Sequence, residues 1–512
     1  MYIKSVLLLF FIFIEGGFLI AQNIEFNKAF PISPYSDSWS FSIQDAPGGY
    51  IVYGITVDST NHQDPAITKI DSAGNILWQK SYHKVGYDFI PFGTNNELGV
   101  LSPSGGGLEV ITWQNDTSSQ TDYWGLYRFD QNGDTLWTKN NRDTTSFFID
   151  EIKATRNKTN LIFGCWTNWS DQNYTMCTLF LRKTDSMGNE IWRRTYHNTI
   201  NSTREPSGID TCKDGGYILC AYENDTIANY SKLACQNGEI VIMKTDSSGN
   251  IQWVKYITNP LCDVHAFSIR TLKNGGYAVC GFWDDSLNWN GAIAFSHIYL
   301  AKLNDTGNMI WNKTYGVHNI SGYDGLYNLR EMPNGDIVSC GYGDTINEAE
   351  PGSILRTDSN GNQKWLKYYY KFYPGDADYL TDILVTRDGG FISSGWTFSS
   401  PPYIWVVKTD SLGCDTIGCN YSTGVGVVKE ESGGVKVYPN PNNGSFRISL
   451  SNINDKCNVE IYNVLGERVY KATLNSANTK INLSEQSAGV YFYRVIKEDG
   501  GLIGSGKLIS EK

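Results

Sequence analysis

A short motif recurs seven times along the chain and limits the fold more than any other feature. In its fullest form, Lys69–Lys80, a basic residue and Asp71 precede a turn that ends at Gly74, and Trp78 and a second basic residue follow. The later copies pair a turn residue with a tryptophan: Asp130 with Trp137, Asp185 with Trp192, Asp246 with Trp253, Asn304 with Trp311, and Asp358 with Trp365. The seventh copy, at Asp410, lacks the tryptophan. The copies recur about every 56 residues, which is close to the length of a β-propeller blade.

A second repeated element precedes the turn motif and completes the blade. Its clearest copies are Asp214–Cys220, Asn274–Gly281 and Asp388–Gly395, each a glycine-containing turn followed by an apolar strand. One more alternating stretch lies before each copy, as in Ala266–Arg270. Each repeat therefore contains four strands joined by hairpins, which is one blade. In Asp71–Gly74 we expect a type I turn closed by a left-handed glycine.

Basic residues flank each turn motif at fixed positions. They precede the turn residue by two, as Lys69 does, and follow the tryptophan by two, as Lys80 does. We expect their stems to cover the tryptophan rings and their charged groups to pair with the turn aspartates. This local pairing is favoured over a ring of cations that binds an acidic ligand.

The first residues after the apolar N-terminus match the strand that the seventh copy lacks. Asn23–Phe30 resembles Asn250–Ile257, with Phe26 in the place of Trp253. We predict that this strand pairs into the last blade and closes the ring, because closure removes an open sheet edge. Residues 22–419 are thus predicted to form an all-β, seven-bladed β-propeller with four-stranded blades.

The N-terminus has the layout of a signal peptide. Lys4 precedes the apolar run Val6–Ile14, and a second short run leads to Ala21. Residues 1–21 are therefore predicted to be removed near Ala21. The apolar run is interrupted at Glu15 and is short for a membrane span, so we expect no membrane span after cleavage.

Composition excludes some partners and cofactors. The net charge is −11, from 42 basic and 53 acidic residues, so no nucleic acid is expected as a partner. Among the 11 cysteines, Cys414 with Cys419 and Cys235 with Cys262 are candidate disulfide pairs, while Cys220, Cys280 and Cys340 recur at one apolar strand position. There is no Cys-x-x-Cys pair and the six histidines are scattered, so we expect neither a metal nor a cofactor.

The composition changes after Cys419. Residues 420–434 are rich in Gly, Ser and Val and are predicted to be a linker. Residues 435–512 alternate in strand fashion between Gly and Asn turns, which predicts a compact antiparallel β-sandwich of about seven strands.

Four motifs stand in order along residues 435–512. They are Tyr438-Pro439-Asn440-Pro441, a central Tyr-Asn-x-Leu-Gly that ends at Gly466, a Gly-Val-Tyr-x-Tyr strand that begins at Gly489, and a final Lys-Leu-Ile that begins at Lys507. These residues resemble the C-terminal (type A) sorting domain of cargo of the type IX secretion system of Bacteroidetes. The resemblance implies export across the inner membrane, then passage through secretion machinery that reads this domain. It also implies removal of the domain and either release from the cell or attachment to its surface.

Aromatic residues outside the repeat are the best candidates for ligand contact. Trp113, Trp169 and Trp289 are expected in long loops, where aromatic faces stack on sugar rings or partner side chains. Trp166, Trp283 and Trp396 occupy similar places after the second strand and are interpreted as packing residues. No motif for catalysis, phosphate binding or calcium binding is present.

Several carboxylates break the repeat and are expected in loops between strands: Glu205, Asp284, Asp285, Glu348, Glu350, Asp376 and Asp378. Two hypotheses follow, and a purely structural role in a surface layer is a third alternative. The favoured one is a monomeric secreted or cell-surface binding or adhesion protein, whose propeller holds a glycan or protein ligand without catalysis. The alternative is a secreted polysaccharide hydrolase or lyase with paired carboxylates, Asp284 with Asp285 or Asp376 with Asp378, as acid and base.

Overall fold

A computed structural model describes residues 25–416 and 435–511, apart from gaps at 32–36, 58–61, 84–86, 91–98, 102–106, 117–120, 143–145, 156, 171–173, 198–201, 226–237, 260–262, 288–292, 317–321, 344–349, 373–376, 400, 451–456, 464–467, 475, 477 and 498–501. The chain divides into two compact units, Met1–Cys419 and Asn420–Lys512. The predicted signal peptide and linker lie outside the described residues. Within those residues every regular element is a strand, and there is no helix that could cross a membrane.

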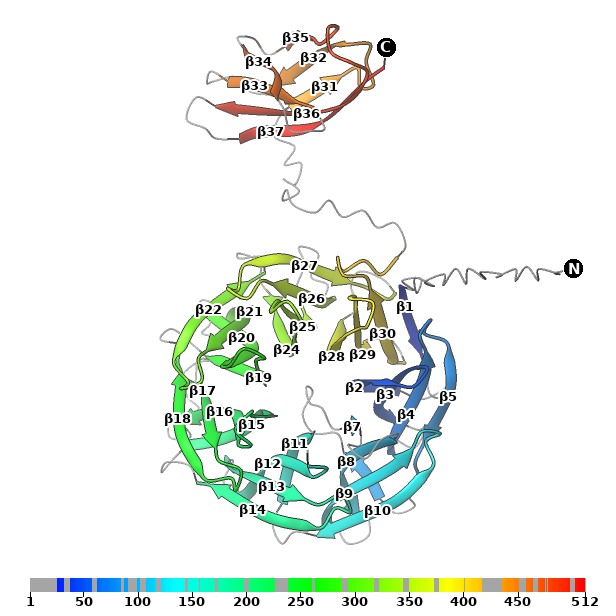
Figure 1. Ribbon diagram of the computed structural model, residues 1–512, viewed down its shortest axis with the longest axis vertical. Helices are drawn as coiled ribbons and strands as arrows, with labels where there is room; N and C mark the ends of the chain where they lie inside the picture. Colours follow the sequence, from blue (N-terminus) through cyan, green and yellow to red (C-terminus); the bar gives the residue numbers. More distant parts are fainter. Residues whose placement is uncertain are drawn as a thin grey trace, which may run out of the picture. The chain divides into compact units, whose positions relative to one another are not determined.

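The first unit is a ring of antiparallel sheets, and Figure 1 shows one sheet after another from blue to yellow. Blade 1 contains β2 (Asp37–Ala46), β3 (Gly49–Val57), β4 (Gln63–Asp71) and β5 (Ile76–Ser81), and blade 2 contains β6 (Tyr87–Ile90), β7 (Gly99–Leu101), β8 (Gly107–Asp116), β9 (Thr121–Asp130) and β10 (Thr135–Arg142). Blade 3 contains β11 (Ser146–Ala154), β12 (Asn160–Ser170), β13 (Tyr174–Thr184) and β14 (Glu190–Tyr196), and blade 4 contains β15 (Ser202–Thr211), β16 (Tyr217–Asp225), β17 (Glu239–Thr245) and β18 (Ile251–Ile257).

The remaining three blades complete the ring. Blade 5 contains β19 (Val264–Thr271), β20 (Tyr277–Leu287), β21 (Ile293–Leu303), β22 (Met309–Tyr315) and β23 (Gly322–Tyr323), and blade 6 contains β24 (Gly325–Glu331), β25 (Ile337–Tyr342), β26 (Gly352–Thr357) and β27 (Gln363–Tyr369). Blade 7 contains β28 (Asp378–Val385), β29 (Phe391–Thr397), β30 (Tyr403–Thr409) and β1 (Phe26–Phe30). The all-β propeller is thus confirmed. Blades 2 and 5 depart from the predicted four strands, since each has one extra short strand.

The N-terminal strand β1 closes the ring by pairing with β30, from Phe26 opposite Lys408 to Phe30 opposite Ile404. Asn27 secures this pairing. Its side-chain oxygen accepts a hydrogen bond from the indole N–H of the fully buried Trp405 at 2.8 Å. Its amide nitrogen donates to the Tyr370 carbonyl at 3.1 Å. The predicted closure is therefore confirmed.

An aromatic ring of each blade packs beneath a turn glycine of the next. A Cβ placed on the glycine would come within 2.6–3.6 Å of a ring carbon in seven cases: Gly74 over Phe26, Gly133 over Trp78, Gly188 over Trp137, Gly249 over Trp192, Gly307 over Trp253, Gly361 over Trp311, and Gly413 over Trp365. These glycines also have positive φ, from 74° to 79°, as the predicted turn requires. The repeated tryptophan is thus a contact between blades.

The basic residues after the tryptophans only partly match their prediction. Lys80, Lys313 and Lys367 lie 5.6–5.9 Å from the centroids of their tryptophan rings, as expected. The predicted partner is wrong, however. Lys80 binds Asp134 of the next blade at 2.6 Å, one residue after the turn glycine. The turn aspartates are occupied by their own turns: Asp71 Oδ1 accepts the Ala73 and Asn75 N–H groups, each at 2.8 Å.

The second unit packs two sheets against each other around one core. One sheet contains β31 (Val435–Tyr438), β32 (Ser445–Leu450) and β35 (Asn478–Asn482), and the other contains β33 (Cys457–Tyr462), β34 (Arg468–Leu474), β36 (Gly489–Lys497) and β37 (Leu502–Ser510). Phe446, Val459 and Leu508 are fully buried among the core residues. These seven strands match the predicted sandwich.

The described cysteines fall into two groups. Cys220, Cys280 and Cys340 are fully buried and free, as the apolar strand position predicted. Cys414 is disulfide-bonded. Its candidate partner Cys419, like Cys235 and Cys262, lies outside the described residues.

Replacing Gly249 by alanine should destabilise the propeller more than replacing Gly215 of the same blade. Both glycines have positive φ, 79° and 84°, which costs alanine about 1–2 kcal/mol. Only at Gly249 would the new Cβ meet a ring, Trp192 at 3.0 Å, so we expect about 1–3 kcal/mol of further loss from overpacking. Urea unfolding of the full chain measures both. Equal losses would show that the ring contact does not hold the blades together.

Asn27→Ala should lower the free energy of unfolding by about 1–3 kcal/mol, because the buried Trp405 indole N–H loses its acceptor. Ser81→Ala, at the exposed end of β5, is the matched control and should change it by less than about 0.5 kcal/mol. Thermal and urea unfolding measure both variants. If Asn27→Ala behaved like the control, β1 would not be held by this residue.

Candidate functional site

A continuous row of aromatic rings crosses blades 4 to 7, at the strand ends opposite the tight turns. Successive ring centroids are 3.6–5.6 Å apart. We call this row the aromatic belt, and in order its members are Tyr222, His265, Phe282, Phe267, Tyr327, Tyr342, Tyr379, Trp396 and Phe398. All lie on or directly after the two inner strands of their blades, which face the centre of the ring in Figure 1.

Strand alternation and β-bulges direct these rings. In β19 the side chains of Val264 and Ala266 are buried, while His265 and Phe267 are partly exposed. The pairing of β19 with β20 shifts between Ala266 and Ser268, so Phe267 has no cross-strand partner. Tyr327 occupies the same bulge in β24. A bulge turns the extra residue away from the regular alternation of side chains. The Phe267 and Tyr327 rings therefore point away from their own sheets and pack against each other.

At the blade 4–5 end of the belt lies a group that we call the Tyr222 cluster: Glu205, Tyr222, Asp263, His265 and Asp284. The His265 ring stacks on Tyr222, with centroids 3.6 Å apart and planes within 16°, and on Phe282 at 4.5 Å. Glu205 of β15 lies directly opposite Tyr222 in the strand register. The Tyr222 hydroxyl donates to the Asp263 carboxylate. Three carboxylates therefore surround the Tyr222 phenol, on which the His265 imidazole stacks.

The surroundings fix the charge states in this cluster. Burial, and then the carboxylates of Asp263, Glu205 and Asp284, raise the pKa of Tyr222. Burial lowers the pKa of His265 to about 3. At neutral pH the phenol is therefore protonated and the imidazole uncharged. Burial also raises the pKa of Glu205, although its side chain is exposed, because nearby protein replaces part of the water around it.

Asn259 holds the two buried aspartates in place. Its side-chain amide donates to the main-chain carbonyls of Asp263 at 3.1 Å and of Asp284 at 2.6 Å. The Asp263 carboxylate also accepts the Gly238 N–H at 2.7 Å. Both aspartates are buried, Asp263 with 5% and Asp284 with 1% exposure. In the part of the chain that the structure describes, no group of three or more His, Cys, Asp or Glu residues is placed to hold a metal ion.

The blade 6–7 end of the belt carries a second carboxylate. The Tyr379 hydroxyl donates to Glu350 at 2.5 Å, and Tyr342 and Tyr327 pack beside Tyr379. Burial first, and then Glu350, raise the pKa of Tyr379. The Asp378 carboxylate, which is buried, accepts the Lys371 N–H at 3.1 Å. This end thus presents protonated phenols beside a carboxylate.

The carboxylates singled out from the sequence are only partly brought together. Glu205 lies in β15, Asp284 in β20 and Asp378 in β28, so the prediction that they lie in loops is wrong for these three. Asp284 lies next to Asp263, since Asn259 binds the main-chain carbonyls of both. The side chain of its predicted partner Asp285 lies outside the description, so that pairing stays a prediction. Glu348 and Asp376 also lie outside the described residues. The pairing of Asp376 with Asp378 therefore stays a prediction.

The tryptophans expected in loops are placed in strands where they are described. Trp113 lies in β8 opposite Trp124, and Trp169 lies in β12 opposite Thr175, because these strands run further than the sequence pattern indicated. Their side chains, and all of Trp289, lie outside the description. Ligand contact by these three residues stays a prediction.

Trp396 differs from the two tryptophans with which it was grouped. Trp166 packs on Phe180 at 4.6 Å and Trp283 on Tyr299 at 5.3 Å, as packing residues do. Trp396 instead joins the belt, on Tyr379 at 4.7 Å. Trp396 comes directly after a strand glycine, whereas Trp166 and Trp283 each come two residues after theirs. A shift of one residue turns a side chain to the other face of a strand.

The sequence analysis overlooked the belt, although a signal for it was present. Tyr222, Phe282, Tyr342 and Trp396 occupy one position of the repeat, directly after Ala221, Gly281, Gly341 and Gly395. An aromatic residue at one position in four successive blades predicts rings side by side. His265 and Tyr379 carry no such signal, because they precede the recognisable part of the inner strand.

In the second unit the first and last sorting motifs meet. The Asn440 side chain donates to the Lys507 carbonyl at 2.9 Å and accepts the Ile509 N–H at 2.8 Å. Tyr438, Pro439, Pro441 and the Lys507 side chain are exposed around this contact. Gly489 begins β36, and Gly466 lies outside the described residues. The two ends of the domain thus form one exposed edge.

Comparisons with known proteins agree with this division into units. Residues 436–510 match the family model of the secretion system C-terminal sorting domain. An ulvan lyase of Nonlabens ulvanivorans, NLR42, is 37% identical over 223 residues, which cover 41% of this chain and 40% of that protein. The chain therefore spans less than half the length of this curated relative. The matched share exceeds the whole of Asn420–Lys512, so the likeness extends into the first unit.

Two solved structures resemble the chain at low identity. The β-propeller domain of the Trilobed protease from Pyrococcus furiosus is 8% identical with a TM-score of 0.39, covering 75% of this chain and 98% of that one. The polysaccharide lyase Uly1 is 11% identical with a TM-score of 0.43, covering 77% and 94%. At these scores neither likeness bears on activity. With its sorting domain matched, the chain is a β-propeller protein exported through the type IX secretion system to the cell surface or the extracellular space.

Proposed function

We propose that this exported protein degrades a polysaccharide that contains uronic acid, by β-elimination. The observation that carries the proposal is the 37% identity to an ulvan lyase, which reaches beyond the sorting domain into the propeller. It supports the polysaccharide-active alternative over the binding or adhesion hypothesis that the sequence favoured.

The aromatic belt supplies the surface for the sugar chain. Sugar rings bind to aromatic faces through their C–H groups, and the belt offers rings without a break across four blades. Phe398, at one end, is 60% exposed, while Tyr222, at the other, is 8% exposed. Tyr327, midway along the belt, is also 8% exposed. A chain laid along the belt would therefore meet its most open ring at Phe398, at the end away from the Tyr222 cluster.

The Tyr222 cluster supplies the proton transfers of elimination. A base removes the proton on the carbon beside the uronate carboxyl group, a C=C bond forms, the glycosidic C–O bond breaks, and the leaving oxygen takes a proton. His265 is uncharged and makes only ring contacts with the described residues, so its nitrogen is available to a substrate proton. With a pKa of about 3 it is a weak base in the free protein, and the carboxylate of a bound uronate would raise that pKa and strengthen the base. Tyr222 is protonated and can donate one. The stacked rings place acid and base on one side of the substrate.

A second reaction class is open to the same cluster. Hydrolysis needs two carboxyl groups and a water molecule, and Glu205 and Asp263 both lie near Tyr222. The products separate the two classes, because elimination leaves an unsaturated uronate at the new end and hydrolysis does not.

The purified full chain should release products with the ultraviolet absorbance of unsaturated uronates from ulvan, and none from a neutral β-glucan. His265→Gln and Tyr222→Phe should each lower kcat at least about 100-fold, since each removes one proton transfer. Tyr217→Phe, on the same strand at the opposite end, is the matched control and should leave kcat unchanged. New reducing ends without absorbance would identify a hydrolase. Saturable binding of ulvan without cleavage would instead support the adhesion hypothesis.

The pH profile tests His265 separately. Because burial lowers the pKa of His265 to about 3, the imidazole stays uncharged until the pH falls toward that value. We therefore expect no loss of kcat/KM between pH 7 and pH 5, where an ordinary histidine with a pKa of about 6.5 would become protonated. Initial rates on ulvan across this range measure it. An acid limb near pH 6.5 that disappears in His265→Gln would contradict the charge state described here.

A further inference from the structure

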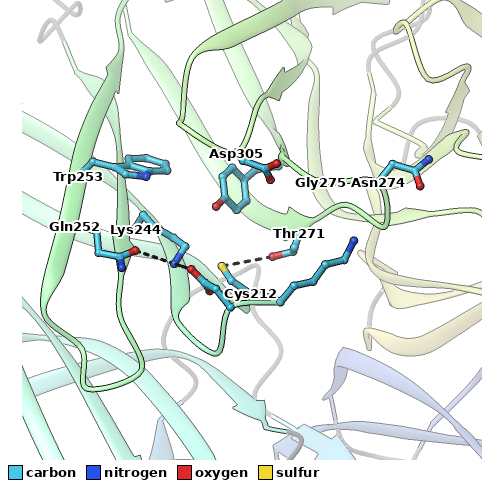
Figure 2. Close-up of a pocket in the computed structure, with 11 residues that line it drawn as sticks. Cys212, Lys244, Gln252, Trp253, Thr271, Asn274, Gly275 and Asp305 are labelled. Atoms are coloured by element: carbon cyan, nitrogen blue, oxygen red, sulfur yellow. Dashed lines mark hydrogen bonds and ion pairs between the residues drawn. The ribbon is translucent and has the colours of Figure 1, made fainter.

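A cavity of about 440 Å³ opens between blades 4 and 5 on the face of the tight turns. It lies at the opposite ends of the strands from the aromatic belt, since its lining residues flank the hairpins of both blades. They are Cys212, Lys213, Asp214, Lys244, Gln252, Trp253, Thr271, Asn274, Gly275, Tyr277 and Asp305, and Figure 2 draws them around the cavity. This volume is within the range of about 300–1,000 Å³ that is usual for small-molecule sites.

At neighbouring blade interfaces a basic side chain fills the equivalent space by bridging to the next blade. Lys302 donates to the Ser359 carbonyl at 3.1 Å, and Arg356 to the Ser411 carbonyl at 2.7 Å. Lys183 donates to the Tyr217 hydroxyl at 3.0 Å, which in turn donates to the Ser247 carbonyl. Each of these serines follows the first residue of its turn. In blade 5 that position is Asp305, which lines the cavity.

Lys244, the residue that would make the bridge here, stays in its own blade. Its Nζ donates to Asp214 at 2.7 Å, to the Thr245 carbonyl at 2.9 Å and to Gln252 at 3.1 Å, as Figure 2 shows in part. The space that a bridge would cross is therefore left open.

A small side chain at the base of the first hairpin of blade 4 is a second reason why this space stays open. Cys212, Leu272 and Met332 occupy the same turn position in blades 4, 5 and 6, because each exchanges main-chain hydrogen bonds with the residues three and four places on. Leu272 and Met332 are buried, with 3% and 6% exposure, and fill their sites. Cys212 is smaller and only half-buried, so the site in blade 4 is not filled.

The lining is polar, balanced in charge and bounded by aromatic rings. Two cations, Lys213 and Lys244, are matched by two carboxylates, Asp214 and Asp305, and Gln252 and Asn274 add amide donors and acceptors. Trp253 and Tyr277 lie as an edge-on pair with centroids 6.0 Å apart. Alternating donors and acceptors beside an aromatic face suit hydroxyl groups on a ring more than a single charge.

We propose that this cavity is a binding site for a neutral sugar unit, separate from the aromatic belt and independent of the activity proposed above. The sugar hydroxyls would exchange hydrogen bonds with Asp214, Gln252 and Asp305, and the ring would pack against Trp253. The Cys212 thiol would not react with the ligand, because burial raises its pKa to about 11 and keeps it protonated.

The test uses saturation-transfer NMR on the full chain, with methyl glucoside, methyl galactoside and methyl xyloside as neutral probes and glucuronate as the charged probe. At least one neutral probe should bind, and more tightly than glucuronate. Cys212→Leu, which copies Leu272 of the next blade and narrows the cavity, should weaken that binding at least tenfold. Cys212→Ser keeps the cavity open and should bind like the parent chain.

Two further measurements separate binding in this cavity from binding at the belt and from a loss of folding. Trp396→Ala alters the aromatic belt and removes any signal that the belt adds, whereas the part of the neutral-probe signal that Cys212→Leu removes should persist in it. Equal thermal unfolding midpoints for Cys212→Leu and Cys212→Ser would show that lost binding is not lost folding. The proposal is overturned if no neutral probe binds, if Cys212→Leu binds as well as Cys212→Ser, or if glucuronate binds best.

Discussion

The packing of an aromatic ring beneath the turn glycine of the next blade is the contact on which the whole ring depends. It recurs at every interface, and at the last one Phe26 takes the place of tryptophan beneath Gly74. Tyrosine hydroxyls strengthen it where they donate to the carbonyls of the same glycines, as Tyr196 does to Gly249 at 2.9 Å. A side chain at the glycine would collide with the ring, so the residue type and the left-handed turn are needed together.

Because these contacts hold the blades at the outer strands and the tight turns, the opposite strand ends are free to vary. That is where the aromatic belt and the Tyr222 cluster lie, with the buried carboxylates of Asp263 and Asp284. The cavity between blades 4 and 5 lies instead on the face of the tight turns. It lies among the repeated turns, at an interface where Lys244 stays in its own blade and the hairpin residue is the small Cys212.

The repeat made the fold predictable, including the closing strand. Each blade packs an aromatic ring beneath the turn glycine of the next blade, and these residues recur at fixed positions. The site was less predictable. Trp396 was interpreted as packing and proved to belong to the belt, because one residue of offset decides the face of a strand. Asp284 was expected in a loop, whereas it lies in β20, and Asn259 from the preceding blade connection binds its main-chain carbonyl together with that of Asp263. Sequence neighbours are a poor guide to partners at blade interfaces.

The sequence by itself determined the β-propeller, its closure by the N-terminal strand and the sorting domain, since all three are written in short motifs with fixed spacing. Only the tertiary structure decided which aromatic rings form one row, which carboxylates surround Tyr222 and which blade interface stays open. These depend on contacts between side chains of different blades, which are set by strand registers and bulges. No local sequence pattern specifies such contacts.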